Sequence, residues 1–164
     1  MLSLLNVIEQ SGLATAIHES GSLWGYPLIL FLHTIGFGTL VGINAAIDLR
    51  LLGFGAGIPL KSFEKMFRLM WAGFALNAAT GSLLFIVDAV KHGTNPAFYV
   101  KLTFVAAGLF VLTRIRKNVF RASGNDEAAI VRLGKILGAT SLGCWLIVIS
   151  AARLMAYIAE YINA

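Results

Sequence analysis

One uncharged, apolar stretch near the start of the chain, from Pro27 to Ile47, constrains the fold most strongly. As a helix it is long enough to cross the hydrocarbon core of a bilayer, which takes roughly 20 residues. Trp24 and Tyr26 precede it, where aromatic side chains typically mark a membrane interface, and charged residues follow it from Asp48 onward. The stretch therefore predicts a membrane-spanning helix over about residues 26–47.

The composition extends this prediction to the whole chain. Of the 164 residues, 58% are hydrophobic and 13% are charged, whereas soluble domains have roughly 45–50% apolar and about 25% charged residues. We therefore expect an all-α polytopic membrane protein, a four-transmembrane-helix bundle with a short N-terminal interfacial helix. The predicted segments are an amphipathic interfacial segment over 1–22 and a four-helix transmembrane domain over 23–164, with spans at about 26–47, 69–90, 98–114 and 136–158.

Lysine and arginine are unevenly distributed between the connections. They concentrate between the first and second spans and between the third and fourth, and residues 1–22 contain none. Because such residues stay on the cytoplasmic side, we expect both termini on the opposite side. The basic residues flank apolar helices and form no stripe on a soluble element, so the net charge of +5 indicates no nucleic-acid partner. The expected partners are the lipid bilayer and either further copies of this chain, as a homo-oligomer, or other membrane subunits.

All three histidines fall in the outer half of this topology. His33 lies inside the first span, about nine residues or roughly 13 Å beyond Trp24 along a helix. An ionisable side chain at membrane depth is energetically costly and is a functional-site hypothesis by default. Neutral imidazole is a good ligand for haem iron, copper or zinc.

The sharpest hypothesis is that His33 is an axial ligand of haem b, held between the helices of the bundle. His92 is the first candidate for the second axial ligand, which makes His33 and His92 the predicted metal-binding pair. His18 on a folded-back segment and Met155 in the fourth span are the alternatives. A basic side chain near the outer surface would pair with the haem propionates; the candidates are Arg153, Lys91 and Lys101.

A purely structural role for His33 remains open, with its ring hydrogen-bonded to Asn77, Thr80 or a backbone carbonyl. Asp48 and Arg50 are two residues apart and do not face each other on a helix, so we expect each to contact another helix or a lipid head group. Hydrolase and phosphoryl-transfer motifs are absent, and the single cysteine excludes an intramolecular disulfide. A redox or accessory subunit fits this inventory better than a stand-alone enzyme.

Several of these residues carry a resemblance to a known group of proteins. The sequence WGYP from Trp24, then His33, then DLRLLG from Asp48, resembles small bacterial four-span membrane proteins of unknown function, as does NPAF from Asn95. The resemblance covers most of the chain from Trp24 to about Arg116. It implies a four-helix fold in a bacterial inner membrane, where both termini would be periplasmic. A looser similarity in architecture, to copper-resistance-type and b-type cytochrome membrane domains, is an analogy of fold alone.

Three functions follow as hypotheses. The leading one is a haem-b-binding electron-transfer subunit that passes electrons between the quinol pool and a periplasmic redox protein. The second is a membrane anchor or accessory subunit of a larger complex, with no bound cofactor. The third and weakest is copper handling through His18, His33 and His92.

Overall fold

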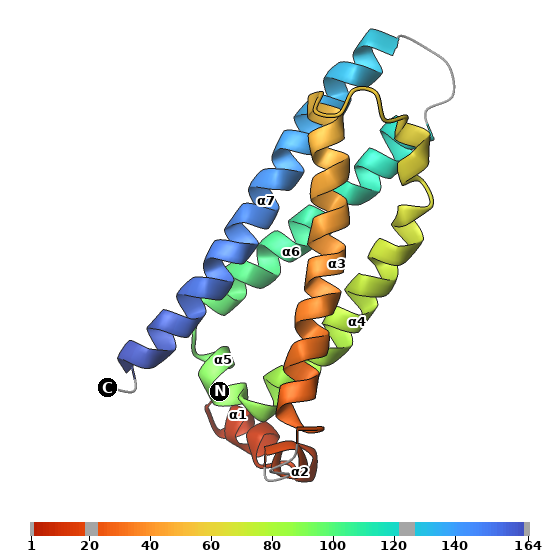
Figure 1. Cartoon of the computed structure of the whole chain (residues 1–164). Coiled ribbons are helices and arrows are strands. Elements are labelled where there is room, and N and C mark those ends of the chain that lie inside the picture. Colours follow the sequence, from red (N-terminus) through yellow and green to blue (C-terminus); the bar gives the residue numbers. More distant parts are fainter. Residues whose placement is uncertain (1, 19–22, 122–126, 163–164) are drawn as a thin grey trace.

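The computed structural model describes residues 2–18, 23–121 and 127–162, and every regular element in these ranges is helical (Figure 1). Four helices are long and apolar enough to cross a membrane, which agrees with the expected multi-pass, all-α architecture. The long helices are α3 (Tyr26–Leu52), α4 (Met66–Val87), α6 (Pro96–Ile115) and α7 (Glu127–Ile162). The short elements are α1 (Leu2–Glu9), α2 (Gly12–His18), the 3₁₀ turn η1 (Leu60–Phe63), α5 (Ala89–Gly93) and the π turn η2 (Arg116–Phe120).

The N-terminal segment differs from the single interfacial helix that the sequence predicts. It forms two short helices, α1 and α2, which pack against α4 and α5. Leu5 and Ala14 are buried there, and Leu5 fills the space beside Gly93, where a Cβ would lie 2.8 Å from the leucine side chain. The predicted boundary between residues 22 and 23 borders residues 19–22, which lie outside the described residues.

Local sequence signals explain where the long helices begin and end. Pro27 lies in the first turn of α3, where its missing N–H removes no helical bond. Gly53 ends α3 in the left-handed conformation, with φ of 109°, which glycine adopts without strain. Asn95 caps α6 by accepting a hydrogen bond from the Ala97 N–H at 3.0 Å. Asp88, with φ of −121° and ψ of 47°, separates α4 from α5.

The closest helix crossing joins α3 and α4 at two glycines. A Cβ on Gly36 would lie 2.8 Å from the backbone nitrogen of Asn77 and 2.9 Å from the Gly73 carbonyl oxygen. A Cβ on Gly73 would lie 3.0 Å from the Gly36 carbonyl oxygen. Small residues at such crossings allow backbones in a membrane to approach closely. Gly38 and Gly42, which share the glycine-rich part of the sequence, contact nothing within 4 Å at their Cβ positions.

The remaining helices complete the bundle around a hydrophobic core to which α3, α4, α6 and α7 all contribute. Helix α6 packs against α7, where the Trp145 ring covers Gly108, and α7 packs against α3. Trp145, Ile47 and Met70 are among the large side chains that are fully buried. Helices α4 and α6 are not among the pairs that pack closely. The bundle is therefore two tight helix pairs, α3–α4 and α6–α7, joined through α3 and α7.

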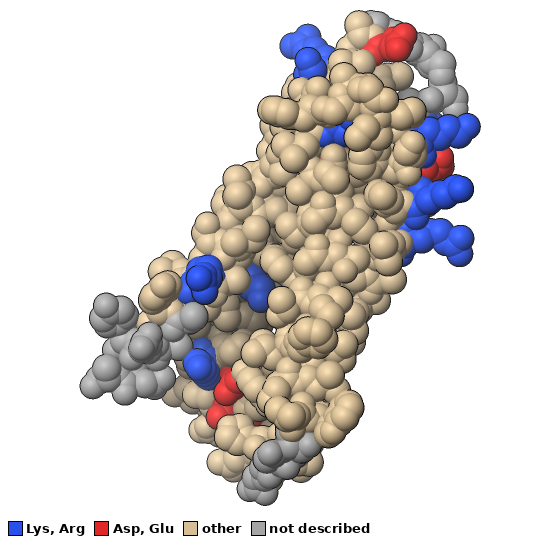
Figure 2. All heavy atoms as spheres, viewed as in Figure 1, with Lys and Arg blue, Asp and Glu red and all other residues tan. Residues whose placement is uncertain are grey.

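The two ends of the bundle differ in charge. Both chain ends lie toward the same end of the bundle, and the connections from α3 to α4 and from α6 to α7 lie at the other (Figure 1). Lysine and arginine side chains gather around that connecting end, with few near the terminal end (Figure 2). In the terminal half of the bundle, which is the half nearer the two chain ends, the lysine and arginine residues are Lys91, Lys101 and Arg153. The fold keeps the charge asymmetry on which the predicted orientation rests.

The Gly36 crossing predicts a specific loss of stability. Replacing Gly36 with Ala should lower the free energy of unfolding by about 1–3 kcal/mol, because the new methyl group meets backbone atoms that cannot rotate away. Gly38→Ala is the matched control, since it adds a methyl group where nothing lies within 4 Å. Thermal unfolding of both variants in detergent measures the effect. Equal unfolding temperatures for the two variants would show that the crossing is not close.

Candidate functional site

A cavity of about 570 Å³ opens between α4 and α6, in the terminal half of the bundle. This is the pair of helices that does not pack closely. The volume lies within the range of roughly 300–1,000 Å³ that is typical of small-molecule and cofactor sites. The lining is mostly apolar, with five polar or charged side chains: His33, Asn77, Ser82, His92 and Lys101.

His33 reaches the cavity from α3 and is held against α4. Its Nδ1 lies 3.0 Å from the Asn77 carbonyl oxygen and 3.1 Å from the Thr80 hydroxyl. The Thr80 hydroxyl donates to the Leu76 carbonyl at 2.7 Å, so it can accept from the ring. A Cβ on Gly81 would lie 2.9 Å from His33 Cε1, which means that glycine leaves the space the imidazole occupies.

These contacts define the state of the imidazole. A carbonyl oxygen can only accept, so Nδ1 carries the hydrogen in the neutral ring and Nε2 carries the lone pair. The Asn77 amide nitrogen lies 3.3 Å from both ring nitrogens and donates to the His33 carbonyl at 2.9 Å. The Asn77 amide is therefore within hydrogen-bond distance of the Nε2 lone pair, and a ligand at Nε2 would replace that contact.

His92 lines the same cavity from α5. The break at Asp88 starts this short helix, and the His92 N–H donates to the Asp88 carbonyl at 3.0 Å. The His92 ring packs edge-on against Phe98 at 5.8 Å between centroids, and Phe98 stacks on Phe85 at 5.4 Å. Its Nδ1 is buried and has no hydrogen-bond partner in the described part of the chain. Such an atom costs free energy unless something bonds it.

The surroundings of His92 keep its imidazole neutral. Burial lowers the pKa of His92 from its ordinary value of 6.5, and the positive charges of Lys101 and Lys91 lower it further. The carboxylates of Asp88 and Glu9 oppose this shift. A neutral imidazole is the form that binds a metal ion.

The structure separates the other predicted site residues from this cavity. Lys91 and Arg153 are exposed, and Met155 on α7 is partly buried, with its backbone carbonyl accepting from Asn95 at 3.4 Å. None of these three lines the cavity, whereas Lys101 does. Of the basic residues predicted to face haem propionates, Lys101 is therefore the one in position.

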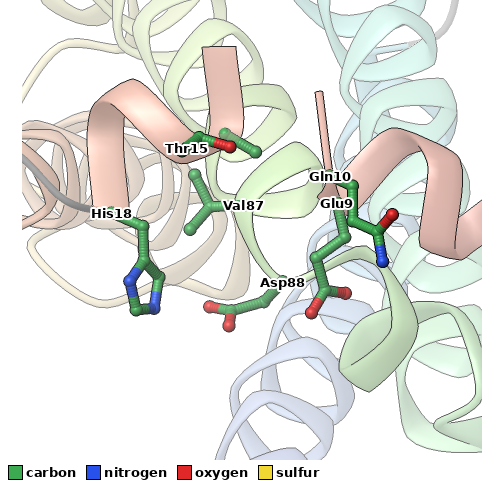
Figure 3. A pocket seen from close by; sticks show the side chains of 7 residues that line it. Glu9, Gln10, Thr15, His18, Val87 and Asp88 are labelled. Carbon is green, nitrogen blue, oxygen red and sulfur yellow. The ribbon is translucent and has the colours of Figure 1, made fainter. Parts of the chain in front are cut away.

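His18 belongs to a different, more polar pocket at the terminal end, of about 320 Å³. Figure 3 shows His18 from α2 on one side of this pocket, with the carboxylates of Asp88 and Glu9 across from it. Glu9 accepts a hydrogen bond from the Val90 N–H at 2.7 Å, and Asp88 accepts one from the Tyr26 hydroxyl at 3.5 Å. The three histidines thus do not converge, and the described residues hold no group of three or more His, Cys, Asp or Glu side chains suited to a metal ion.

Comparison of the chain with protein-family models, with curated proteins and with solved structures found no match. The site is accordingly interpreted from its own residues and geometry.

The lowered pKa of His92 predicts how stability depends on pH. The unfolded chain takes up a proton near pH 6.5, while the folded protein resists protonation of His92 to lower pH. The contribution of His92 is therefore present above the unfolded pKa and is lost as pH falls through the folded pKa. His92→Gln should flatten the fall in unfolding temperature between about pH 7 and about pH 5. His18→Gln, at an exposed position, is the control. A wild-type pH profile in His92→Gln would contradict the assignment.

Proposed function

We propose that the protein binds haem b in the cavity between α4 and α6 and transfers electrons. The observation that carries the proposal is that His33 and His92, from two different helices, line one apolar cavity. These two histidines would be the residues that hold the haem group. Haem supplies one-electron chemistry when it is bound.

The residues around the cavity fit such a group in size and in chemistry. The volume of about 570 Å³ and the mostly apolar lining suit a flat, apolar macrocycle. His33 donates its Nδ1 hydrogen to the Asn77 carbonyl, the arrangement that orients metal-bound histidines and makes Nε2 a better ligand. Lys101 supplies a positive charge for a carboxylate substituent.

The structural role for His33 accounts for fewer of the observations. The bonds of His33 to Asn77 and Thr80 are those that a packing role requires. That role does not explain the cavity in front of the ring. It also does not explain why His92 lines the same cavity. A ligand held by the two histidines accounts for the cavity and for both histidines in its lining.

The position of the cavity supports a direction for electron transfer. It lies in the terminal half of the bundle, away from the basic connections. With the basic end in the cytoplasm, as the positive-inside rule favours, both termini and the cavity are on the periplasmic side of a bacterial inner membrane. Electrons would then pass between the quinol pool in the membrane and a redox protein in the periplasm.

Histidine variants test the ligand assignment. The detergent-purified apoprotein would be titrated with haem, and bound haem would be quantified by absorption after removal of the excess. We expect His33→Ala and His92→Ala to lower bound haem at least tenfold, because each removes a histidine that would hold the group. His18→Ala is the matched control and should bind as the wild type does. Haem binding that is unchanged in His33→Ala, or weakened equally in all three variants, would contradict the assignment.

A second function, as an accessory subunit without cofactor, is favoured by one observation. Gly38 and Gly42 on α3 are exposed and one helical turn apart, and their Cβ positions face open space. Small residues four apart on a lipid-facing helix are typical of contacts with another transmembrane helix. Stoichiometric co-purification of other membrane subunits, lost in Gly38→Leu, would support this function. A wild-type protein that stays alone and binds haem would contradict it.

A further inference from the structure

A second group of polar side chains lies deep in the bundle, between α3 and α7, toward the end with the long connections. Asn44, Asp48 and Ser141 are each 0% exposed. The Asn44 side-chain amide donates to Asp48 Oδ2 at 2.6 Å and to Ser141 Oγ at 2.7 Å. Asn44 and Asp48 are four residues apart on α3, so they share the helix face that meets α7.

The Asp48 carboxyl group also has a side-chain hydrogen bond with Ser141. Two oxygen atoms of this cluster still have no donor among the described residues. Asn44 Oδ1 and Asp48 Oδ1 are buried and lack any hydrogen-bond partner among the described residues. Helix α7 lies against the backbone here, because a Cβ on Gly138 would lie 3.1 Å from the Asp48 carbonyl oxygen. Two unpaired acceptors in a water-poor interior leave a large desolvation cost uncompensated.

Among the described residues, no basic side chain bonds Asp48 to compensate its charge. Arg50, two residues on, bonds instead to the carbonyl oxygens of Ile58 at 2.7 Å and Ala56 at 3.0 Å. No Lys or Arg within the described ranges forms a hydrogen bond with the Asp48 carboxyl group. The remaining titratable neighbour is the Cys144 thiol on α7, which cannot supply a positive charge. A buried carboxylate that lacks a basic partner requires a proton or another cation.

We propose that the Asn44–Asp48–Ser141 cluster binds one small monovalent cation, H⁺ or Na⁺, at the unpaired oxygens of Asp48 and Asn44. A bound proton sits on the carboxyl group and neutralises it. A bound Na⁺ is coordinated by the two oxygens, which are the hard ligands that such an ion prefers. A water molecule alone could donate to both oxygens, but it would leave the negative charge buried.

Thermal unfolding in detergent tests the proposal, with pH and Na⁺ varied separately. The Na⁺ series replaces choline chloride with sodium chloride at constant ionic strength, so that only the identity of the cation changes. Asp48→Asn is the main variant, because it is isosteric and removes the charge without leaving a cavity. Glu64→Gln, which changes an exposed carboxylate at the same end of the bundle, is the matched control.

Two results support the proposal and identify the cation. If Na⁺ is bound, the unfolding temperature of the wild type and of Glu64→Gln rises with Na⁺, and that of Asp48→Asn does not. If a proton is bound, the wild type loses stability relative to Asp48→Asn as pH rises, with no response to Na⁺. Infrared spectra then contain the carbonyl band of a protonated carboxyl group, and Asp48→Asn removes it.

The opposing result is equally specific. The proposal would be overturned if the unfolding temperatures of the wild type and of Asp48→Asn responded identically to pH and to Na⁺, and if no protonated-carboxyl band could be assigned to Asp48. The test does not depend on haem, since Asp48 does not line the cavity that contains His33 and His92.

Discussion

The close approach of α3 and α4 at Gly36 and Gly73 determines how the rest of the bundle is arranged. Because the two backbones nearly touch there, the His33 ring is pressed against the next turns of α4, where Gly81 leaves room and Thr80 and the Asn77 carbonyl bond it. Helix α6 packs closely on α7, and its contact with α4 is looser, with Phe98 of α6 stacked on Phe85 of α4. The space that remains between α4 and α6 is the cavity, so one helix contact both positions a histidine and leaves space in front of it.

Polar groups inside an apolar bundle are expensive, and here they gather in two separate places. In the terminal half, His33 and His92 face the cavity. At the connecting end, Asn44, Asp48 and Ser141 are fully buried between α3 and α7. Each place contains buried polar atoms that the described part of the chain leaves without a partner. Intramembrane polar groups of this kind are typically tied to function, and the two proposals assign a different ligand to each place.

Much of the fold, but less of the site, can be predicted from the sequence. The apolar stretches predicted the four long helices. The depth of His33 made it a candidate site residue, and the structural alternative for His33 named Asn77 and Thr80 as its hydrogen-bond partners, which the structure confirms. The placement of His92 could not be predicted, because neither proline nor glycine marks the break at Asp88 that turns α5 toward the cavity. Lys101 lines the cavity, whereas Arg153 and Lys91 do not. The sequence could not predict this choice, because it depends on how α6 is rotated relative to α4.

The burial of Asp48 has a signal in the sequence, which is its spacing from Asn44. The predicted first span ended at residue 47 and so placed Asp48 at the membrane interface. Helix α3 instead continues to Leu52, which places Asp48 inside the bundle. Asn44 and Asp48 are four apart and therefore share a helix face, which would have indicated a common polar contact. The identity of Ser141 as their partner depends on how α7 docks, and no local pattern encodes that.

The most direct measurement of the central claim is the visible absorption spectrum of the full-length protein, purified in mild detergent from cells supplied with haem, before and after reduction with dithionite. The account predicts a Soret band in the oxidised protein and sharp α and β bands on reduction, as a haem with two histidine ligands gives. A spectrum without these bands in either state, from protein that thermal unfolding shows to be folded, would contradict the account.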